Sequence, residues 1–312
     1  MDRLGQLDLL VAVAEAGSIS GAAQARGLSV AAASRTLAAL EERLGVLLVR
    51  RNTRTLSLTD EGAKLLARAR GILADVADSE AEVTGAVLAP SGLLRVSASL
   101  SFGLLHIAPR LPAYHARYPN VRVHVEISNR YVDLIDAGID VAIRTREFEP
   151  DRAITIRRLA ETRRVLTAAP SYLAAHGIPV HPHDLARHAL LLYVYANNPN
   201  ELSFTRGTET VRVPAHGLLE SNDGQILRAA ALNGLGILVQ PTYIVHADVA
   251  AGRLMPVLDD WDLPRLRINF AYPTRKHLSA KVRSFIAFMA AEFEANDYAE
   301  RWTRMPRLSG PS

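Results

Sequence analysis

Residues 27–45, GLSVAAASRTLAALEERLG, constrain the fold most, because they predict a helix with two unlike faces. The face that we expect to be buried consists of Ala33, Leu37, Leu40 and Leu44. The opposite face consists of Ala31, Ser34, Arg35 and Ala38. Helix propensity alone would explain the alanines. A smooth face with one hydroxyl and one guanidinium is, however, suited to lie closely against another surface.

The residues before this helix predict two more helices. Residues 6–16 have the apolar spacing of a helix and stop at Gly17. Ser18 or Ser20 can cap a second, short helix, which ends at Gly27. The order of helix, short helix, turn and helix is the helix-turn-helix pattern.

The residues after it, VLLVRRNTRTLSLTDEG at 46–62, predict two short strands. Their tip is cationic, since Arg50, Arg51 and Arg54 surround Asn52 and Thr53. This element resembles the wing of a winged helix. Thr59, followed by two acidic residues, predicts the start of another helix.

A long helix is predicted from residue 60 to about residue 88. Its seam, at a 3, 4 spacing, consists of Leu66, Ala69, Leu73, Val76, Glu80, Val83 and Val87, in which Ala69 and Glu80 are weak positions. About 29 residues at a rise of about 1.5 Å extend about 43 Å, longer than a compact domain needs. The seam predicts a partner helix, and dimerisation is expected through Leu66, Leu73, Val76 and Val83. The alternative is a helix that folds onto its own chain.

After the breaker APSGLL at 89–94, strands and helices alternate. LLRVSAS, a helix around 107–117, VRVHVEIS, a short helix at 132–137 and IDVAIRT predict a parallel βαβαβ unit. A second unit of the same kind is predicted from RRVLTAA to GILVQ. LRINFAY and a helix at 279–293 are expected to return to the first unit, and residues 301–312 to form a disordered tail.

The chain resembles LysR-type transcriptional regulators over almost its full length. The resemblance rests on AEAGSISGAAQARGLSVAAASRTLAALEERLGVLLVRRNTRTLSLTDEGAKLL, LRVSAS, DVAIR and LNGLGILVQP. It implies an α/β fold class with an N-terminal winged helix-turn-helix (1–59), a linker helix for dimerisation (60–89) and an effector-binding domain (90–300). The last resembles periplasmic solute-binding proteins, with subdomain I at about 90–162 and 266–300 and subdomain II at about 163–265.

The resemblance implies a ligand-responsive, sequence-specific DNA-binding regulator, not an enzyme, with no cofactor. The expected partners are double-stranded DNA, a small-molecule effector, further copies of the chain in a dimer and tetramer, and RNA polymerase. A gel shift would separate this function from the alternative, a cytosolic solute-binding or enzymatic α/β protein with a vestigial DNA-binding module.

The base-reading helix of the family usually starts Leu-Ser-Gln-Pro, whereas this chain has Leu28, Ser29, Val30 and Ala31. A valine cannot make the bidentate contact of a glutamine with adenine, but it can touch a thymine methyl group. Arg35 is expected to contact guanine and the wing arginines to contact phosphate. The expected DNA-binding residues are Ser29, Val30, Ala31, Ser34, Arg35, Arg50, Arg51, Asn52, Thr53 and Arg54.

An effector site is expected beyond the carboxyl ends of the strands, where open α/β sheets bind ligands. The expected residues are Ser99, Ser101, Phe102, Arg144, Thr145, Asn222, Asp223, Gln225, Gln240 and Pro241. Each of them alone is equally compatible with a turn or cap. Hydroxyls, a helix start and Arg144 favour a small organic acid. Asp223 would repel an anion unless it faces outward or accepts a hydrogen bond from a ligand hydroxyl.

Composition excludes several other kinds of site. The chain has no cysteine, which excludes disulfides, thiolate catalysis and cysteine-based metal sites. The net charge is only +4, so a basic patch must be local. His176, His181, His183 and His188 lie close in sequence, but nothing completes a familiar ligand spacing and no metal is expected. Gly234 and Gly236 lack the rest of a dinucleotide-binding motif.

The sequence also predicts a cytoplasmic protein without a membrane partner. No apolar run approaches the roughly 20 residues that span a bilayer, and the N-terminus lacks the order of a signal peptide.

Overall fold

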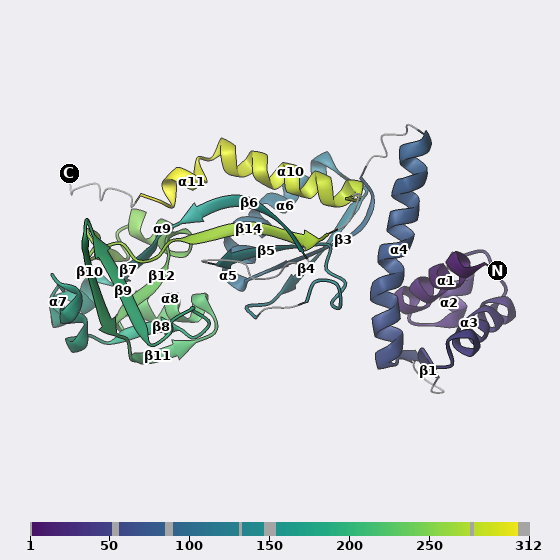
Figure 1. The fold of residues 1–312 in the computed structure, drawn as a ribbon, viewed down its shortest axis with the longest axis horizontal. Helices are drawn as coiled ribbons and strands as arrows, with labels where there is room; N and C mark the ends of the chain where they lie inside the picture. The colour runs from purple at the N-terminus through teal and green to yellow at the C-terminus, as the bar shows by residue number, and fades with distance from the viewer. Residues whose placement is uncertain are drawn as a thin grey trace. The chain divides into compact units, whose positions relative to one another are not determined.

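The computed structural model describes residues 2–51, 56–84, 90–130, 133–146, 154–274 and 278–304 (Figure 1). Contacts divide the chain into two compact units. The first comprises residues 1–91, 132–140 and 275–283, and the second comprises residues 92–131, 141–274 and 284–312. Among the residues that the structure describes, no helix combines the length and the apolar character needed to cross a membrane.

The first unit begins with three helices, α1 (Arg3–Ala16), α2 (Ile19–Ala25) and α3 (Val30–Leu44). Ser18 and Ser29 cap α2 and α3, each accepting a backbone N–H three residues further on, at 3.0 and 3.1 Å. Asp2 caps α1 in the same way, so this helix starts three residues earlier than predicted. Gly17 and Gly45 end α1 and α3 with φ of 63° and 70°, a left-handed conformation that favours glycine.

The apolar face of α3 is packed against α1 and α2. Ala33, Leu37 and Leu40 are buried there together with Leu10 and Val13. Leu44, by contrast, is 40% exposed, which corrects the prediction that it belongs to the buried face. It is the last residue of α3, and Gly45 turns the chain away directly after it.

Two antiparallel strands, β1 (Val49–Arg51) and β2 (Leu56–Leu58), follow α3 and pair Arg50 with Ser57. The Glu41 carboxylate ties them to α3, since it accepts the N–H groups of Leu48 and Val49 at 2.7 and 3.1 Å. A Cβ at Gly62 would lie 2.0 Å from the carbonyl oxygen of Leu48, so the close approach of the next helix requires glycine.

Helix α4 (Asp60–Thr84) starts at the predicted cap, where Thr59 Oγ1 accepts the Gly62 N–H at 2.9 Å. Figure 1 shows α4 alongside α1. Leu66 and Ala69 pack on Val11 of α1 and are 8% and 0% exposed. This corrects the assignment of Leu66 to a dimer seam, because a side chain buried against its own chain has no surface left for a partner.

The second unit contains two five-stranded sheets. The first has the order β4-β3-β5-β14-β6. Its strands are β3 (Gly92–Ala98), β4 (Val121–Ile127), β5 (Val141–Arg146), β6 (Ile154–Thr162) and β14 (Leu266–Pro273). β4, β3 and β5 are parallel, as predicted, and β14 returns antiparallel between β5 and β6. We call this sheet and its helices subdomain I.

The helices of subdomain I are α5 (Leu100–Phe102), α6 (Leu111–Arg117), α10 (Ala280–Ala295) and α11 (Tyr298–Arg301), with a π-helical turn (Gly103–Ile107) and a 3-10 turn (Ala108–Arg110) before α6. Figure 1 shows α10 over the strands of this sheet, and Tyr114 of α6 is hydrogen-bonded to Ser284 of α10 at 2.9 Å.

The predicted short helix at 132–137 is absent from its described part, residues 133–137, which forms turns. The Asp133 carboxylate accepts the N–H groups of Ile135 and Asp136 at 2.8 and 3.1 Å. These bonds cap a single turn, in which the Ala137 N–H donates to the Asp133 carbonyl oxygen at 3.1 Å, and Gly138, with a φ of 64°, ends the turn before a helix can extend.

The second sheet has the order β11-β8-β12-β7-β13 and defines subdomain II. Its strands are β7 (Arg164–Ala168), β8 (Leu190–Tyr193), β11 (Gly217–Ser221), β12 (Ile237–Pro241) and β13 (Met255–Val257). Its helices are α7 (Pro170–His176), a 3-10 helix (Pro182–Arg187), α8 (Gly224–Leu232) and α9 (Thr242–Ala250). A hairpin of β9 (Glu201–Arg206) and β10 (Glu209–Pro214) forms a separate two-stranded sheet.

The prediction of a second fully parallel unit is wrong in one respect. β11, β8 and β12 are parallel, but β7 pairs antiparallel with β12. Strand direction is decided by the pairing partner, which a hydrophobic pattern does not encode.

The start of the predicted disordered tail is ordered. Trp302 is 2% exposed, and its carbonyl oxygen accepts the Arg163 N–H at 3.0 Å. The prediction of disorder is therefore wrong for residues 301–304, while residues 305–312 lie outside the described residues.

Candidate DNA-binding and effector sites

The outward face of α3 is exposed to solvent within the first unit. Ala31, Arg35 and Ala38 are exposed and Ser34 is half-buried. Val30, the first residue of the helix, is 53% exposed. A major groove about 12 Å wide admits such a helix, because most side chains on the outer face of α3 are small.

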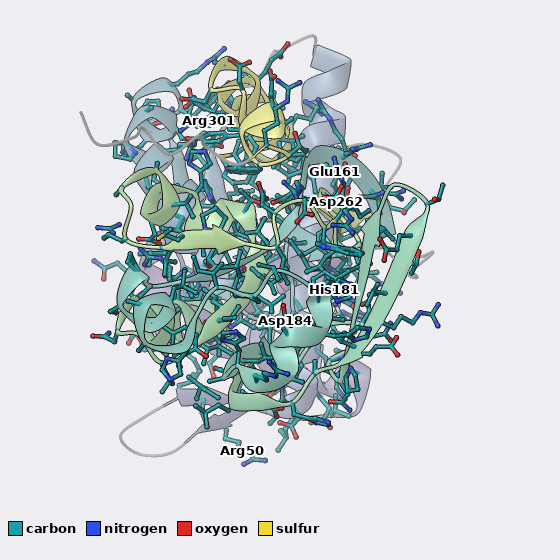
Figure 2. All side chains as sticks on the ribbon, turned by 90° about the vertical axis from the view of Figure 1, so that its left-hand side faces the viewer. Arg50, Glu161, His181, Asp184, Asp262 and Arg301 are labelled. Carbon is teal, nitrogen blue, oxygen red and sulfur yellow. The ribbon has the colours of Figure 1, made fainter. Side chains whose placement is uncertain are left out.

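Four arginines of the first unit fall into two groups. Arg26 forms an ion pair with Asp8 at 2.6 Å, and Arg43 donates to Gln6 at 3.0 Å, so both are held against α1. The hydrogen bonds that Arg26 donates to the Asp8 carboxylate raise the pKa of Arg26. Within the described residues, Arg35 and Arg50 have no ion-pair partner, and Figure 2 shows Arg50 reaching away from its strand. The sequence alone does not separate these two groups.

The other predicted DNA-binding residues have mixed outcomes. Ser29 is the N-cap of α3, so its oxygen already accepts the N–H of Ala32. Arg51 is the last residue of β1. Asn52, Thr53 and Arg54 lie outside the described residues.

Of the predicted seam on α4, Leu73 and Val76 are half-buried, and the side chain of Val83 lies outside the described set.

The carboxyl ends of the parallel strands of both subdomains meet at one junction. Hydrogen bonds across it join Ser101 Oγ to Gln225 Nε2 at 3.0 Å and Asp223 Oδ2 to Asn129 Nδ2 at 2.9 Å. A third, at 2.6 Å, runs from Arg130 Nε to the hydroxyl of Tyr195. The predicted residues Ser101, Asp223 and Gln225 are thus brought together from opposite sides.

Asp223 does not present a free carboxylate at the junction. Its Oδ1 accepts the N–H groups of Gln225 and Ile226 at 2.8 and 3.3 Å and caps α8. Its Oδ2 accepts from Asn129. Because both oxygens already accept hydrogen bonds, the expected obstacle to an anion is reduced.

Gln240 supplies a donor at the same place. The residue is 3% exposed, and its Nε2 has no hydrogen-bond partner among the described residues. A Cβ at Gly224 would lie 3.0 Å from Ser101 Oγ and 3.3 Å from Gln240 Oε1, so these two side chains converge on the first turn of α8. A buried donor without a partner is costly, and a ligand acceptor would satisfy it.

The other predicted effector residues lie in the strands and turns of the two subdomains. Ser99 Oγ accepts the Phe102 N–H at 3.3 Å and caps α5. Ser99 and Thr145 are both hydrogen-bonded to Tyr243, whose pKa is raised mainly by burial. Arg144 lies in β5 opposite Asn269, and Pro241 is the last residue of β12.

Phe102 departs from the expectation. It is completely buried, with its ring 5.2 Å from His106, 5.7 Å from Tyr243 and 5.9 Å from Phe293. Aromatic packing accounts for this burial, which corrects the assignment of Phe102 to the ligand surface.

The sequence reasoning missed four residues of the junction: Asn129, Arg130, Tyr195 and Tyr243. Tyr195 is hydrogen-bonded to Arg130 and to the predicted Asn222, and these bonds lower its pKa. The available signal was position, since Asn129 and Arg130 lie within three residues of the end of β4 and Tyr195 lies two residues after the end of β8.

The histidines that lie close in sequence stabilise turns and ring stacks. Asp184 accepts the N–H of His181 at 2.9 Å, and this bond lowers the pKa of Asp184 (Figure 2). His176 stacks on Tyr172 at 4.3 Å, and the Tyr172 hydroxyl is 3.2 Å from His188 Nδ1. No group of three His, Asp or Glu residues in the described chain is arranged to hold a metal ion.

A helix-turn-helix unit together with a two-subdomain α/β unit defines a regulator that carries its DNA-binding and ligand-binding parts on one chain. Residues 4–63 match the bacterial regulatory helix-turn-helix family of LysR type, and residues 89–294 match the LysR substrate binding domain. The chain belongs to the LysR family of transcriptional regulators.

Known relatives are similar over nearly their whole length. The regulator CrgA of Neisseria meningitidis serogroup C is 33% identical over 93% of this chain and 97% of that protein. DmlR of Escherichia coli is 32% identical over 93% and 94%. The solved structure of CrgA from Neisseria meningitidis has a TM-score of 0.61 at 32% identity, and the match covers 94% of this chain and 99% of that one. The fold class predicted from the sequence is confirmed.

Proposed function

We propose that this LysR-type regulator responds to a small organic acid bound at the junction of subdomains I and II. The observation that carries the proposal is the buried donor Gln240 Nε2, which lies in a residue that is 3% exposed and converges with Ser101 on α8. Hydroxyl and amide donors suit a carboxylate. Binding alters the protein only through a preference for one arrangement of the two subdomains.

Titration with aliphatic and aromatic carboxylates, and with the corresponding amides and amines, tests the effector class. We expect carboxylates to bind tightest, and Gln240→Leu to weaken the tightest one about tenfold, as for one hydrogen bond to a charged group. The measurement is calorimetry on the full chain. Gln24→Leu, an exposed glutamine of the DNA-binding unit, serves as the matched control and should bind like the parent. Tightest binding of an amine would contradict the proposal.

We further propose that α3 reads the operator while the wing holds phosphate. Arg35 and Ser34 on the exposed face of α3 are the proposed base contacts, and Arg50 is a phosphate contact. The remaining proposed contacts are Ser29, Val30, Ala31, Arg51, Asn52, Thr53 and Arg54.

Arg35→Ala and Arg50→Ala distinguish these two roles. Arg35→Ala is expected to lower operator affinity by 1–3 kcal/mol, about five- to 150-fold, and leave random-DNA binding nearly unchanged. Arg50→Ala should weaken both alike and reduce the salt dependence by about one phosphate. Gel shifts on an enriched operator and on random DNA measure both. Equal loss of both kinds of binding in the Arg35 variant would refute the base-reading role.

The working form is proposed to be a cytoplasmic dimer or tetramer without enzymatic activity, which contacts RNA polymerase at the promoter. Val76, half-buried on α4, supports dimerisation through the later turns of that helix, together with Val83 and with Leu73, which is half-buried and also packs against the cluster of Val11, Leu66 and Ala69. The proposed domain limits are 1–59, 60–89 and 90–300, with the subdomain boundaries at about 162 and 265.

A further inference from the structure

Val30 is exposed at a position where its side chain takes no part in the hydrophobic core. It is the first residue of α3 and is 53% exposed, while the side chains of the same helix that form the core are Ala33, Leu37 and Leu40. A β-branched side chain is also a poorer helix former than alanine. Neither helix formation nor packing explains a valine there.

The surroundings of Val30 are apolar and short. The Ser29 hydroxyl caps the helix by accepting the Ala32 N–H at 3.1 Å, and Ala31 adds only a methyl group. The first long polar side chain on this exposed face is Arg35, more than one turn further along. The first turn of α3 therefore offers two apolar groups and no long donor or acceptor.

Thymine is the only one of the four bases that shows a methyl group in the major groove, and an apolar side chain recognises it by contact. We infer that Val30 is a specificity-determining residue that recognises the C5-methyl group of a thymine in each half of the operator. This inference rests on the proposed placement of α3 in the major groove.

Replacement of thymine by deoxyuridine tests the contact, because it removes the methyl group and leaves the hydrogen-bonding edge unchanged. The probe is a duplex enriched from a random pool by the full-length protein, with each thymine changed in turn. Fluorescence anisotropy is expected to show one thymine per half-site whose replacement weakens binding about fourfold, the effect of burying one methyl group.

Two variants separate Val30 from other sources of the effect. Val30→Ala should bind the thymine and deoxyuridine duplexes with a ratio near one. Val46→Ala, which trims a valine that is 40% exposed outside α3, should keep the fourfold ratio. Circular dichroism of both variants checks that the helices are intact.

Two results would overturn the inference while leaving the proposed function in place. One is parent protein that binds every deoxyuridine duplex as tightly as the thymine duplex, and the other is Val30→Ala that still discriminates. Failure to enrich any duplex over random DNA is a different result, since it would overturn sequence-specific binding itself and this inference with it.

Discussion

Trp302→Ala is expected to lower the free energy of unfolding of the second unit by about 4 kcal/mol, within the range for loss of a buried aromatic side chain. The indole is 2% exposed, and its ring lies 4.8 Å from both His106 and Tyr298. It also lies 5.7 Å from Tyr243 of subdomain II, so one side chain packs against both subdomains. Its removal leaves a cavity where they meet.

Urea denaturation of the full chain, followed by circular dichroism, measures the Trp302 effect. Trp302→Phe keeps much of the ring volume and should lose less than half as much stability. Arg304→Ala, two residues further on with a side chain 79% exposed, should stay within about 0.5 kcal/mol of the parent. A Trp302→Ala protein as stable as Arg304→Ala would show that the C-terminal segment does not hold the subdomains.

The aromatic cluster around Trp302 also explains the lowered pKa of His106. Burial lowers the pKa of His106 to about 4, since the aromatic cluster offers its charged form no water. Nε2 donates to the Tyr243 carbonyl oxygen at 3.3 Å. The ring is therefore neutral at physiological pH and packs as an apolar group.

Asp248→Ala is expected to cost about 3 kcal/mol, near the lower end for breaking a buried ion pair. Asp248 is 0% exposed and accepts hydrogen bonds from Arg228, at 2.8 Å from Nη2, and from Arg253. Without the carboxylate both guanidinium groups lose their ion-pair partner. Each keeps some access to water, which limits the loss of stability. Thermal denaturation of the full chain measures it.

Asp248→Ala should also weaken the hydrogen bonds at the junction of the two subdomains. Arg228 Nη1 donates to Gln225 Oε1 at 3.3 Å, which directs Gln225 Nε2 toward Ser101. Arg253→Ala is the matched control, because Arg253 is 57% exposed and its loss leaves the Asp248–Arg228 pair intact. We expect it to cost under about 1 kcal/mol. Equal losses in the two variants would contradict a central role for Asp248.

The sequence by itself determined the features whose causes are local. Ser18, Ser29 and Thr59 cap helices because a hydroxyl within the first turn satisfies free N–H groups wherever that pattern occurs. The two faces of α3 follow from side-chain spacing alone. The parallel direction of β3, β4 and β5 was predicted from their long connections, whereas their order in the sheet was not. Of the proposed effector site, Ser101, Asp223, Gln225 and Gln240 were predictable as polar residues at strand ends and helix starts.

Only the tertiary structure decided what depends on partners distant in sequence. Leu66 has the spacing of a dimer seam, but α1 covers it. Residues 301–304 have no local signal for order, yet Trp302 is fixed by rings from both subdomains. Asp223 Oδ2 accepts a hydrogen bond from Asn129, 94 residues away. Such contacts arise when the chain closes on itself, and the free energy of packing, which no short stretch contains, selects among patterns that are locally equivalent.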